Sequence, residues 1–143
     1  SFAYELANVT KVIDGDTVTL DNAEKVRLIG IDTPERGKCY YKEAKTRLSK
    51  LILNKQVKLE KDISNRDKYK RLLRYIYLND TMINDVLVKE GYAKAYYYEP
   101  DIKHHQYFKI SEISAKKKSL GIWKDCKSSL SIFERLELFF LQL

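Results

Sequence analysis

The sequence is poor in the residues that mark several common protein classes. Its 143 residues include two cysteines, two prolines and five glycines. The two cysteines do not have metal-binding spacing, and no segment reaches the about 20 apolar residues of a membrane-spanning helix. We find no internal repeat and no low-complexity linker. With 44% hydrophobic residues, the chain is expected to fold as one globular domain around one core.

Negatively charged residues are the minority. The chain has 20 Asp and Glu against 27 Lys and Arg, a net charge of +7 and a pI of about 9.3. This excess favours polyanionic partners, nucleic acid or an anionic membrane surface, although a modest positive charge also simply increases solubility. Three of the 11 tyrosines stand together at residues 96–98. They are typical of a base-stacking platform, with core packing of at least one as the alternative.

Hydrophobic periodicity predicts strands first and most helices later. Apolar or alternating runs predict strands at residues 1–12, 16–20, 26–31, 56–62 and 73–78. Helical spacing predicts helices at residues 40–54, 83–90 and 103–119. Five strands, with a helix between the third and the fourth, match a small Greek-key barrel. The pattern alone permits several α+β folds.

Two short apolar segments carry charges where strands seldom do. An Asp-Gly hairpin signal brings Asp16 to the start of a returning strand. The run at residues 26–31 contains Arg27 and leads to Asp32, and Pro34 then stops the strand. The carboxylates of Asp16 and Asp32 are hard oxygen ligands that suit calcium or magnesium. The alternative is that they are turn residues and that Arg27 forms a core ion pair.

A base and a second arginine complete the candidate chemistry. Glu35 follows Asp32 closely and is free to act on a water beside the metal. Arg71 stands where the basic loop at residues 66–71 enters a strand, so it and Arg27 approach from different elements and could bind one phosphate. A metal, a carboxylate base and arginines are the groups that hydrolyse phosphodiesters. For the loop lysines alone, a solvated basic loop is the alternative.

The chain resembles the staphylococcal nuclease (thermonuclease) family in five segments that occur in family order. They are residues 13–17 (IDGDT), 27–35 (RLIGIDTPE), 67–72 (DKYKRL), 87–93 (LVKEGYA) and 115–123 (AKKKSLGIW). The resemblance covers roughly residues 5–125. It implies an α+β, mainly β fold, a five-stranded OB-fold barrel with about three packed helices.

The resemblance also implies an activity and its residues. It implies a Ca2+-dependent endonuclease that cleaves DNA and RNA, with single strands preferred, and leaves 3′-phosphate and 5′-hydroxyl ends. The implied Ca2+ ligands are Asp16, Asp32 and the Thr33 carbonyl, and the implied catalytic residues are Arg27, Glu35 and Arg71. The implied nucleotide-binding residues are Lys68, Tyr69, Tyr96 and Tyr98. The alternative is a non-catalytic OB-fold module that binds single-stranded nucleic acid or a protein partner.

The chain departs from the family pattern in three places. The segment between Glu35 and the helix near Tyr40 is shorter, and Lys70 stands where the family usually has glycine. The tyrosine loop is one residue short, so the role given to Tyr96 could fall on Tyr97. These departures concern the pocket, while the metal and phosphate residues are complete.

The two cysteines lie in segments that bracket the expected domain. A disulfide between Cys39 and Cys126 would tie the loop after Glu35 to the end of the domain, and it would place the protein in an oxidising compartment. The alternative is two free thiols. We expect the protein to be secreted or to lie in the cell envelope, with the cytoplasm as the alternative. No secretion signal is visible in this chain.

Residues 128–143 do not belong to the family pattern. We expect a nuclease-like domain at residues 1–127 and a helical, apolar tail at residues 128–143. The tail is too short to span a bilayer. It could dock on the domain, associate with another copy, or lie on a membrane surface.

Overall fold

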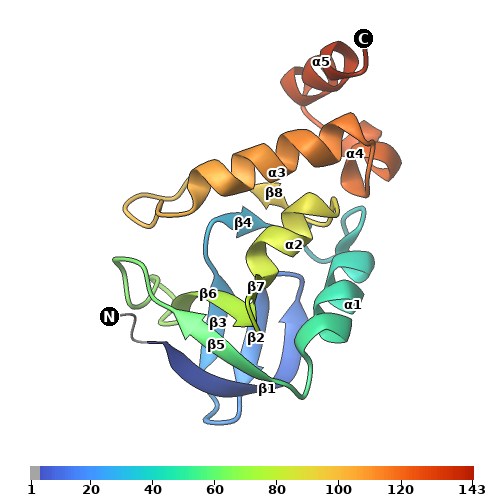
Figure 1. Cartoon of the computed structure of the whole chain (residues 1–143). Helices are drawn as coiled ribbons and strands as arrows, with labels where there is room; N and C mark the ends of the chain where they lie inside the picture. The colour runs from blue at the N-terminus through green and yellow to red at the C-terminus, as the bar shows by residue number, and fades with distance from the viewer. Residues whose placement is uncertain (1–3) are drawn as a thin grey trace.

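The computed structural model describes residues 4–143, and a closed β-barrel forms the lower part of the molecule as drawn in Figure 1. The barrel strands are β1 (Glu5–Asp14), β2 (Thr17–Leu20), β3 (Lys25–Leu28), β5 (Gln56–Glu60) and β6 (Leu72–Leu78). Antiparallel pairs run in the order β3-β2-β1-β5-β6, and a parallel pairing of β3 with β6 closes the barrel. The predicted mainly β, OB-type α+β fold is confirmed.

The long strand β1 belongs to both halves of the barrel. Residues 5–8 pair with β5, and residues 9–14 pair with β2. Register shifts between Val9 and Lys11 and between Val12 and Asp14 interrupt the second ladder. Irregularities of this kind bend a strand, which lets one strand turn the corner of a small barrel.

Helices and short strands cover the barrel. Helix α1 (Tyr41–Ile52) follows β4 (Ile31–Asp32), and α2 (Ile83–Lys89) follows β7 (Thr81–Met82). After β8 (Lys94–Ala95), which pairs with β4, come α3 (His105–Lys117), α4 (Ile122–Asp125), the 3-10 turn η1 (Lys127–Ser129) and α5 (Ile132–Leu141). Figure 1 shows α3 crossing above the barrel and α5 at the far end of the molecule.

Several predicted boundaries need correction. The predicted first strand begins at residues 1–3, which lie outside the described residues, and β1 continues to Asp14. The predicted single strand at residues 26–31 is wrong, because β3 ends at Leu28 and β4 begins at Ile31. Gly30 causes the break: its φ is +78°, and a Cβ there would lie 2.5 Å from the ring of Phe108.

The carbonyl groups at this break accept hydrogen bonds from other parts of the chain. The Ile29 carbonyl accepts a hydrogen bond from Asn84 Nδ2 at 2.9 Å, and the Gly30 carbonyl accepts one from the Tyr96 amide at 2.8 Å. Arg27 Nη1 donates to the carbonyls of Leu28 and Ile31. Because buried backbone groups must be paired, the break is a stable feature, and it connects the strand end to the tyrosine segment.

The hydrophobic interior has two parts. The larger part fills the barrel and the space beneath α1, α2 and α3, with Tyr75, Phe108 and Leu48 among its fully buried side chains. The smaller part is centred on Trp123 and lies between α3, α4 and the C-terminal segment. Leu130 and Leu138 belong to this second part, so the C-terminal segment packs against the rest of the chain.

The C-terminal helix α5 turns its charged side toward the domain and most of its apolar side toward solvent. Its inward side carries Leu138 and two glutamates: Glu134 pairs with Lys94 at 2.9 Å, and Glu137 pairs with Lys116. A capping box on Ser131 begins the helix. The outward side is an exposed apolar stripe made of Ile132, Phe133, Leu136, Phe139, Phe140 and Leu143.

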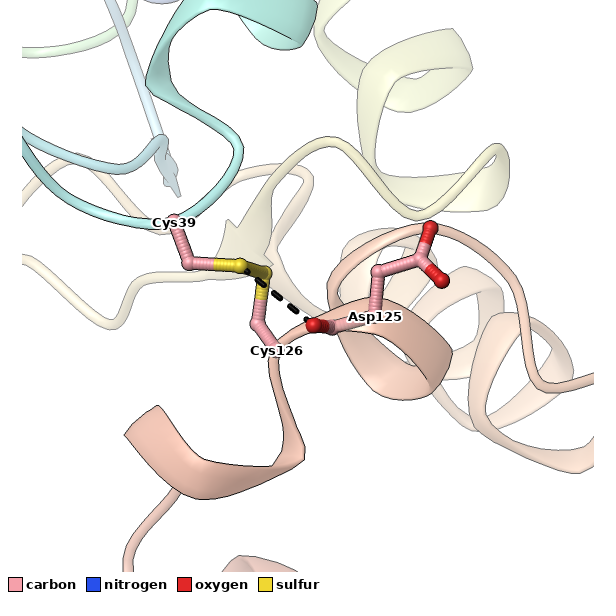
Figure 2. Close-up of a disulfide and its surroundings, with 3 residues drawn as sticks. All are labelled: Cys39, Asp125 and Cys126. Carbon is pink, nitrogen blue, oxygen red and sulfur yellow. Dashed lines mark hydrogen bonds between the residues drawn. A yellow bond between two sulfur atoms is a disulfide. The ribbon is translucent and has the colours of Figure 1, made fainter.

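A disulfide joins the loop before α1 to the end of α4. Figure 2 shows Cys39 bridged to Cys126 across 87 positions of sequence. The dashed line marks the approach of Cys39 Sγ to the Asp125 carbonyl oxygen at 3.5 Å. An oxidised sulfur has no proton to donate, so this is a close contact and not a hydrogen bond.

Within residues 4–143, no helix has the length and apolar character needed to cross a membrane.

Candidate active site

The predicted metal ligands meet where the β1–β2 hairpin touches the start of the loop after β4. Asp16 lies in the hairpin turn, and its amide donates to Asp14 Oδ1 at 3.0 Å. Its Oδ2 accepts a hydrogen bond from the Thr33 amide at 3.0 Å. Gly15 makes this approach possible, because a Cβ there would lie 2.8 Å from Thr33 Oγ1. The hairpin and the loop are therefore held together at the two predicted ligands.

Arg27 joins the two acidic ligands. Its Nη2 lies 3.4 Å from Asp16 Oδ2 and 3.7 Å from Asp32 Oδ1. Asp16 is buried, whereas the Asp32 side chain is 57% exposed. The guanidinium, held by the carbonyls at the strand break, is thus fixed in place beside both carboxylates.

The donor set fits a hard divalent cation. Asp16, Asp32 and the Thr33 carbonyl are oxygen donors, and no imidazole or thiolate lies among the predicted ligands. Within the described part of the chain, no group of three or more His, Cys, Asp or Glu side chains is arranged to hold a metal. Two carboxylates, one carbonyl and waters are a ligand set that calcium and magnesium accept and that zinc disfavours.

Burial raises the pKa of two carboxylates in this cluster, and charge repulsion adds to the effect. Burial, together with the neighbouring charge of Asp16, raises the pKa of Asp14 to about 6. Partial burial also raises the pKa of Asp32, Arg27 opposes that shift, and Asp16 and Glu35 add to it. Carboxylates this close repel one another when ionised. A bound cation would relieve the repulsion.

Most of the other predicted residues line one cavity of about 440 Å3. We call it the tyrosine-side cavity. It brings together eight of the ten predicted catalytic, metal and nucleotide-binding residues: Arg27, Asp32, Glu35, Lys68, Tyr69, Arg71, Tyr96 and Tyr98. Asp16 and Thr33 do not line it, but Asp16 reaches its edge through Arg27.

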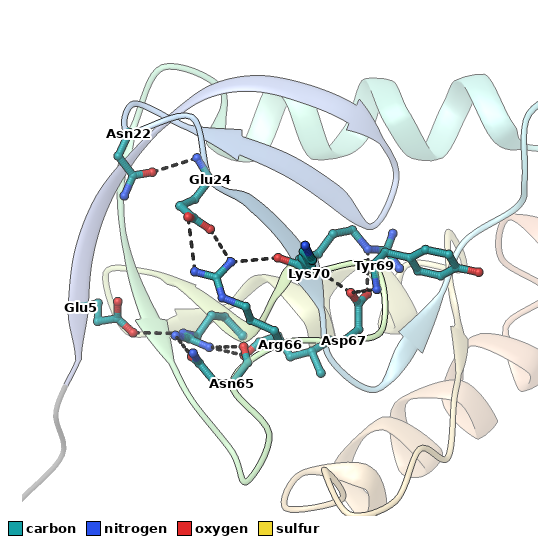
Figure 3. A network of polar contacts seen from close by, with 11 residues as sticks. Glu5, Asn22, Glu24, Asn65, Arg66, Asp67, Tyr69 and Lys70 are labelled. Atoms are coloured by element: carbon teal, nitrogen blue, oxygen red, sulfur yellow. Dashed lines mark hydrogen bonds and ion pairs between the residues drawn. The ribbon is translucent and has the colours of Figure 1, made fainter.

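The loop that carries Arg71 is organised by Asp67. Asp67 Oδ1 accepts the amides of Tyr69 and Arg71, and Oδ2 accepts Arg71 Nε at 2.7 Å. Figure 3 shows this network beside Arg66, which bridges Glu24 and the Lys70 carbonyl. Within residues 4–143 no hydrogen bond uses the terminal nitrogens of Arg71, so they are available to a ligand.

Lys70 has a left-handed backbone with φ of +66°. This conformation is easy for glycine and costs other residues about 1 kcal/mol or more. The geometry gives a physical reason for the glycine usually found here in the resembling family. In this chain Lys70 adopts the less favourable conformation, and the loop is closed by the hydrogen bond from the Lys70 amide to the Asp67 carbonyl.

The tyrosine segment places two rings on one side of the chain. The rings of Tyr96 and Tyr98 stack, with centroids 5.9 Å apart and planes at 22°, and both line the tyrosine-side cavity. Tyr97 points elsewhere, with its hydroxyl on Glu99 and its ring against His105. The geometry thus places Tyr96, and not Tyr97, at this cavity.

Sequence reasoning did not single out Asp67 or Asn84. Asp67 shapes the phosphate loop, and Asn84 supports the break in the strand. The signal for Asp67 was present, because an aspartate four residues before Arg71 can close a turn and hold the guanidinium. Asn84 gave no such signal, because it reaches Ile29 from 55 positions away.

Comparisons with known proteins identify the family. The family described as "Staphylococcal nuclease homologue" matches residues 25–125. A thermonuclease from Staphylococcus intermedius is 42% identical over 125 residues, which cover 81% of this chain and 74% of that protein. A thermonuclease from Staphylococcus hyicus is 37% identical over 126 residues, covering 82% and 75%.

Relatives outside the staphylococci match as well. Endonuclease YncB of Bacillus subtilis is 40% identical over 132 residues, which cover 83% of this chain and 63% of that protein. The matched family segment contains Arg27, Asp32, Glu35 and Arg71, the residues that the fold brings to one cavity. The chain belongs to the staphylococcal nuclease family.

Proposed function

We propose that this protein is a Ca2+-dependent endonuclease that hydrolyses phosphodiester bonds of DNA and RNA. As a member of the family it is a nuclease of the thermonuclease type. The family works with a divalent metal ion; the choice of Ca2+, the substrates and the products are our proposals. The observation that carries them is the convergence of Arg27, Glu35, Arg71 and Asp32 on one cavity.

The two arginines are suited to one phosphate. Arg27 is held rigidly by two carbonyls and two carboxylates, and Arg71 is held through Nε by Asp67. Planar guanidinium groups bind phosphate oxygens through their N–H donors. Among the described residues, the terminal nitrogens of Arg71 are open for such bonds, whereas those of Arg27 already contact protein oxygens, so Arg27 contributes mainly its charge. Because both are fixed before substrate arrives, they stabilise the negative charge that develops on the phosphate oxygens without costly reorganisation.

Glu35 is suited to the role of general base. It is exposed, follows the proposed metal ligands Asp32 and Thr33, and lines the same cavity as the arginines. In our proposal its carboxylate accepts a proton from the attacking water. A Ca2+ ion on Asp16, Asp32 and the Thr33 carbonyl would supply positive charge next to that water and the phosphate.

The stacked tyrosines support binding of an unpaired nucleotide. An aromatic face binds any base, but the base must be free of its duplex partner, so we propose a preference for single strands. Lys68 lies over the Tyr69 ring, with Nζ 5.2 Å from the centroid, and would meet a neighbouring phosphate. By resemblance to the family, we propose that cleavage leaves 3′-phosphate and 5′-hydroxyl ends.

The experiment is digestion of single-stranded DNA and RNA with Ca2+, with Mg2+ and with EGTA. Replacing Arg71 by Ala removes one phosphate-binding group and should lower kcat about 10²- to 10³-fold. Replacing Glu35 by Gln should lower kcat about 10²- to 10⁴-fold while nucleotide binding persists. Lys55→Ala is the matched control, because this exposed lysine lines no cavity described for the chain.

The outcomes separate the enzyme from the binding module. The proposal is supported if cleavage depends on Ca2+, is lost in Arg71→Ala and Glu35→Gln, and is retained in Lys55→Ala. Full activity in Glu35→Gln removes that residue as the base. Binding of single strands without cleavage, at every divalent ion, would assign the chain to the non-catalytic module instead.

We also propose an oxidising location, secreted or in the cell envelope. The Cys39–Cys126 bridge supports this, because disulfides seldom persist in reducing cytosol. Alkylation of thiols in freshly lysed source cells tests it. Two alkylated cysteines in the native protein would place it in a reducing compartment.

Finally, we propose a division of the chain into a catalytic domain at residues 1–127 and a C-terminal attachment segment at residues 128–143. The exposed apolar stripe of α5 favours a second copy of this chain as its partner. A helix that lies on an anionic membrane usually has cations along its polar flanks, whereas here Arg135 and Gln142 flank one side and Glu137 the other. Binding to a lipid surface is the competing outcome.

A further inference from the structure

A second cavity adjoins the tyrosine-side cavity at the catalytic residues. Its volume is about 450 Å3, and its lining includes Asp32 and Glu35, which also line the first. The other lining residues include Lys38, Lys94, Cys39 and Leu130. We call it the disulfide-side cavity. The two cavities therefore open on either side of the proposed base and metal ligand.

An endonuclease must accommodate a nucleotide on both sides of the bond that it cuts. The tyrosine-side cavity contains aromatic and basic groups for one of them. The strand then passes the arginines and Glu35, and it must continue over whatever surface lies beyond. The disulfide-side cavity lies next along such a path, because Glu35 and Asp32 are among its lining residues.

The charges in this cavity suit a backbone phosphate. Lys38 is exposed and follows Glu35 in a turn closed by the bond from the Lys38 amide to the Glu35 carbonyl. Within residues 4–143 it forms no ion pair, so its charge is not neutralised by the protein. Lys94 contributes less, because Glu134 of α5 pairs with it at 2.9 Å.

The remaining walls suit a sugar or a base. Ile122 and Leu130 provide apolar surface, and the Cys39–Cys126 disulfide and Ser129 complete the rim. Leu130 and Ser129 lie beyond the segment matched by the family. The disulfide anchors that segment next to Glu35, and Lys38 immediately precedes the bridged Cys39.

We propose that the disulfide-side cavity binds the nucleotide on the far side of the scissile phosphate, with Lys38 contacting its backbone phosphate. This inference rests on the proposed function and adds to it a subsite built from the disulfide and the C-terminal segment. The chain then binds an oligonucleotide across both cavities, whereas a single nucleotide occupies only the tyrosine-side cavity.

The test compares two probes in the presence of EDTA, so that binding is measured without cleavage. Thymidine 3′,5′-bisphosphate fills one cavity, and a short oligothymidylate reaches both. Lys38→Ala should weaken oligothymidylate binding about three- to tenfold and reduce its salt dependence by about one phosphate contact. Bisphosphate affinity should change less than about twofold. Lys38→Arg should restore oligothymidylate binding, and Lys55→Ala serves as the matched control.

A second variant tests the opposite wall. Ser129→Asp adds a negative charge to the rim from the C-terminal segment, and it should weaken oligothymidylate binding selectively as well. The proposal is overturned if Lys38→Ala matches Lys55→Ala with the oligonucleotide, or if both probes weaken equally. If Lys38→Ala weakens only oligothymidylate binding but the protein cleaves no nucleic acid, the subsite stands and only the nuclease proposal is rejected.

Discussion

Removing the disulfide should lower the free energy of unfolding by an amount that depends on the length of the loop that the bridge closes. The bridge between Cys39 and Cys126 has a sequence separation of 87. In the chain-entropy description, closing a loop of this length in the unfolded state stabilises the fold by up to about 4 to 5 kcal/mol. Residual structure in the unfolded chain reduces this figure, so we expect the double replacement by Ser to cost about 2 to 4 kcal/mol.

Urea unfolding of oxidised protein, reduced protein and the double Ser variant measures this cost. Both unbridged forms should unfold at lower urea, with a larger m-value because the unfolded chain expands. The thermal midpoint should fall by about 5 to 15 °C for a chain of this size. A reducing agent should leave the double variant unchanged, which controls for other effects of the reagent. Equal midpoints and m-values for bridged and unbridged forms would refute the reasoning.

Three further changes test a buried polar contact and two backbone conformations of the fold. Glu60→Gln should cost about 2 kcal/mol at neutral pH. Burial raises the pKa of Glu60, but hydrogen bonds from groups including His104 outweigh burial and lower the pKa. The stability that Glu60 contributes is therefore present above the ordinary pKa of a glutamate and is lost as the pH falls through the pKa of the folded state. The unfolding free energies of the two proteins, measured against pH, should converge in acid, and a constant difference would contradict this. Lys70→Gly should raise stability by about 0.5 to 1 kcal/mol by relieving a φ of +66°, whereas Lys70→Ala should not. Gly30→Ala should cost about 2 to 4 kcal/mol in urea unfolding, because of its positive φ and its contact with the Phe108 ring, and a cost below 1 kcal/mol would mean that the break adapts.

Local patterns predicted most of the strands and the turns that carry several of the candidate site residues. The hairpin at Asp16, the acidic end of the strand containing Arg27 and the loop before Arg71 are each set by a few neighbouring residues. Short-range turn chemistry and alternation are readable in a sequence. The family resemblance then selected the OB-fold barrel among the folds that the pattern permits, and the structure shows that the pairing of β3 with β6 closes this barrel and brings the two arginines to one cavity.

Features that depend on distant residues were not readable. Composition predicts one continuous strand at residues 26–31, whereas the break in it depends on contacts with Phe108 and Asn84 from remote helices. The disulfide stayed one of two alternatives, because two cysteines in a sequence do not reveal whether the fold brings them together.

The apolar tail was ambiguous for a related reason. Residues 132–143 are apolar on nearly all sides of a helix, so hydrophobicity alone does not say which side packs inward. The structure makes the choice through charge: Glu134 and Glu137 find Lys94 and Lys116 on the domain, and the phenylalanine side is turned to solvent. The inward side therefore stabilises the wall of the disulfide-side cavity, and the outward side remains for a partner.

This division predicts that the two sides of α5 can be altered independently. Phe133→Glu with Phe140→Glu places charge on side chains that are 80% and 65% exposed, so the fold should be retained while pairing of two copies is lost. Light scattering should then show a monomer where the unaltered chain forms a dimer, with oligothymidylate affinity unchanged. Glu134→Gln is the inward counterpart: it frees Lys94 beside the cavity, so oligothymidylate binding should strengthen while the dimer persists. If the unaltered chain is a monomer at every concentration, a second copy is not the partner. Vesicle binding that the phenylalanine variant loses would then assign the stripe to a lipid surface.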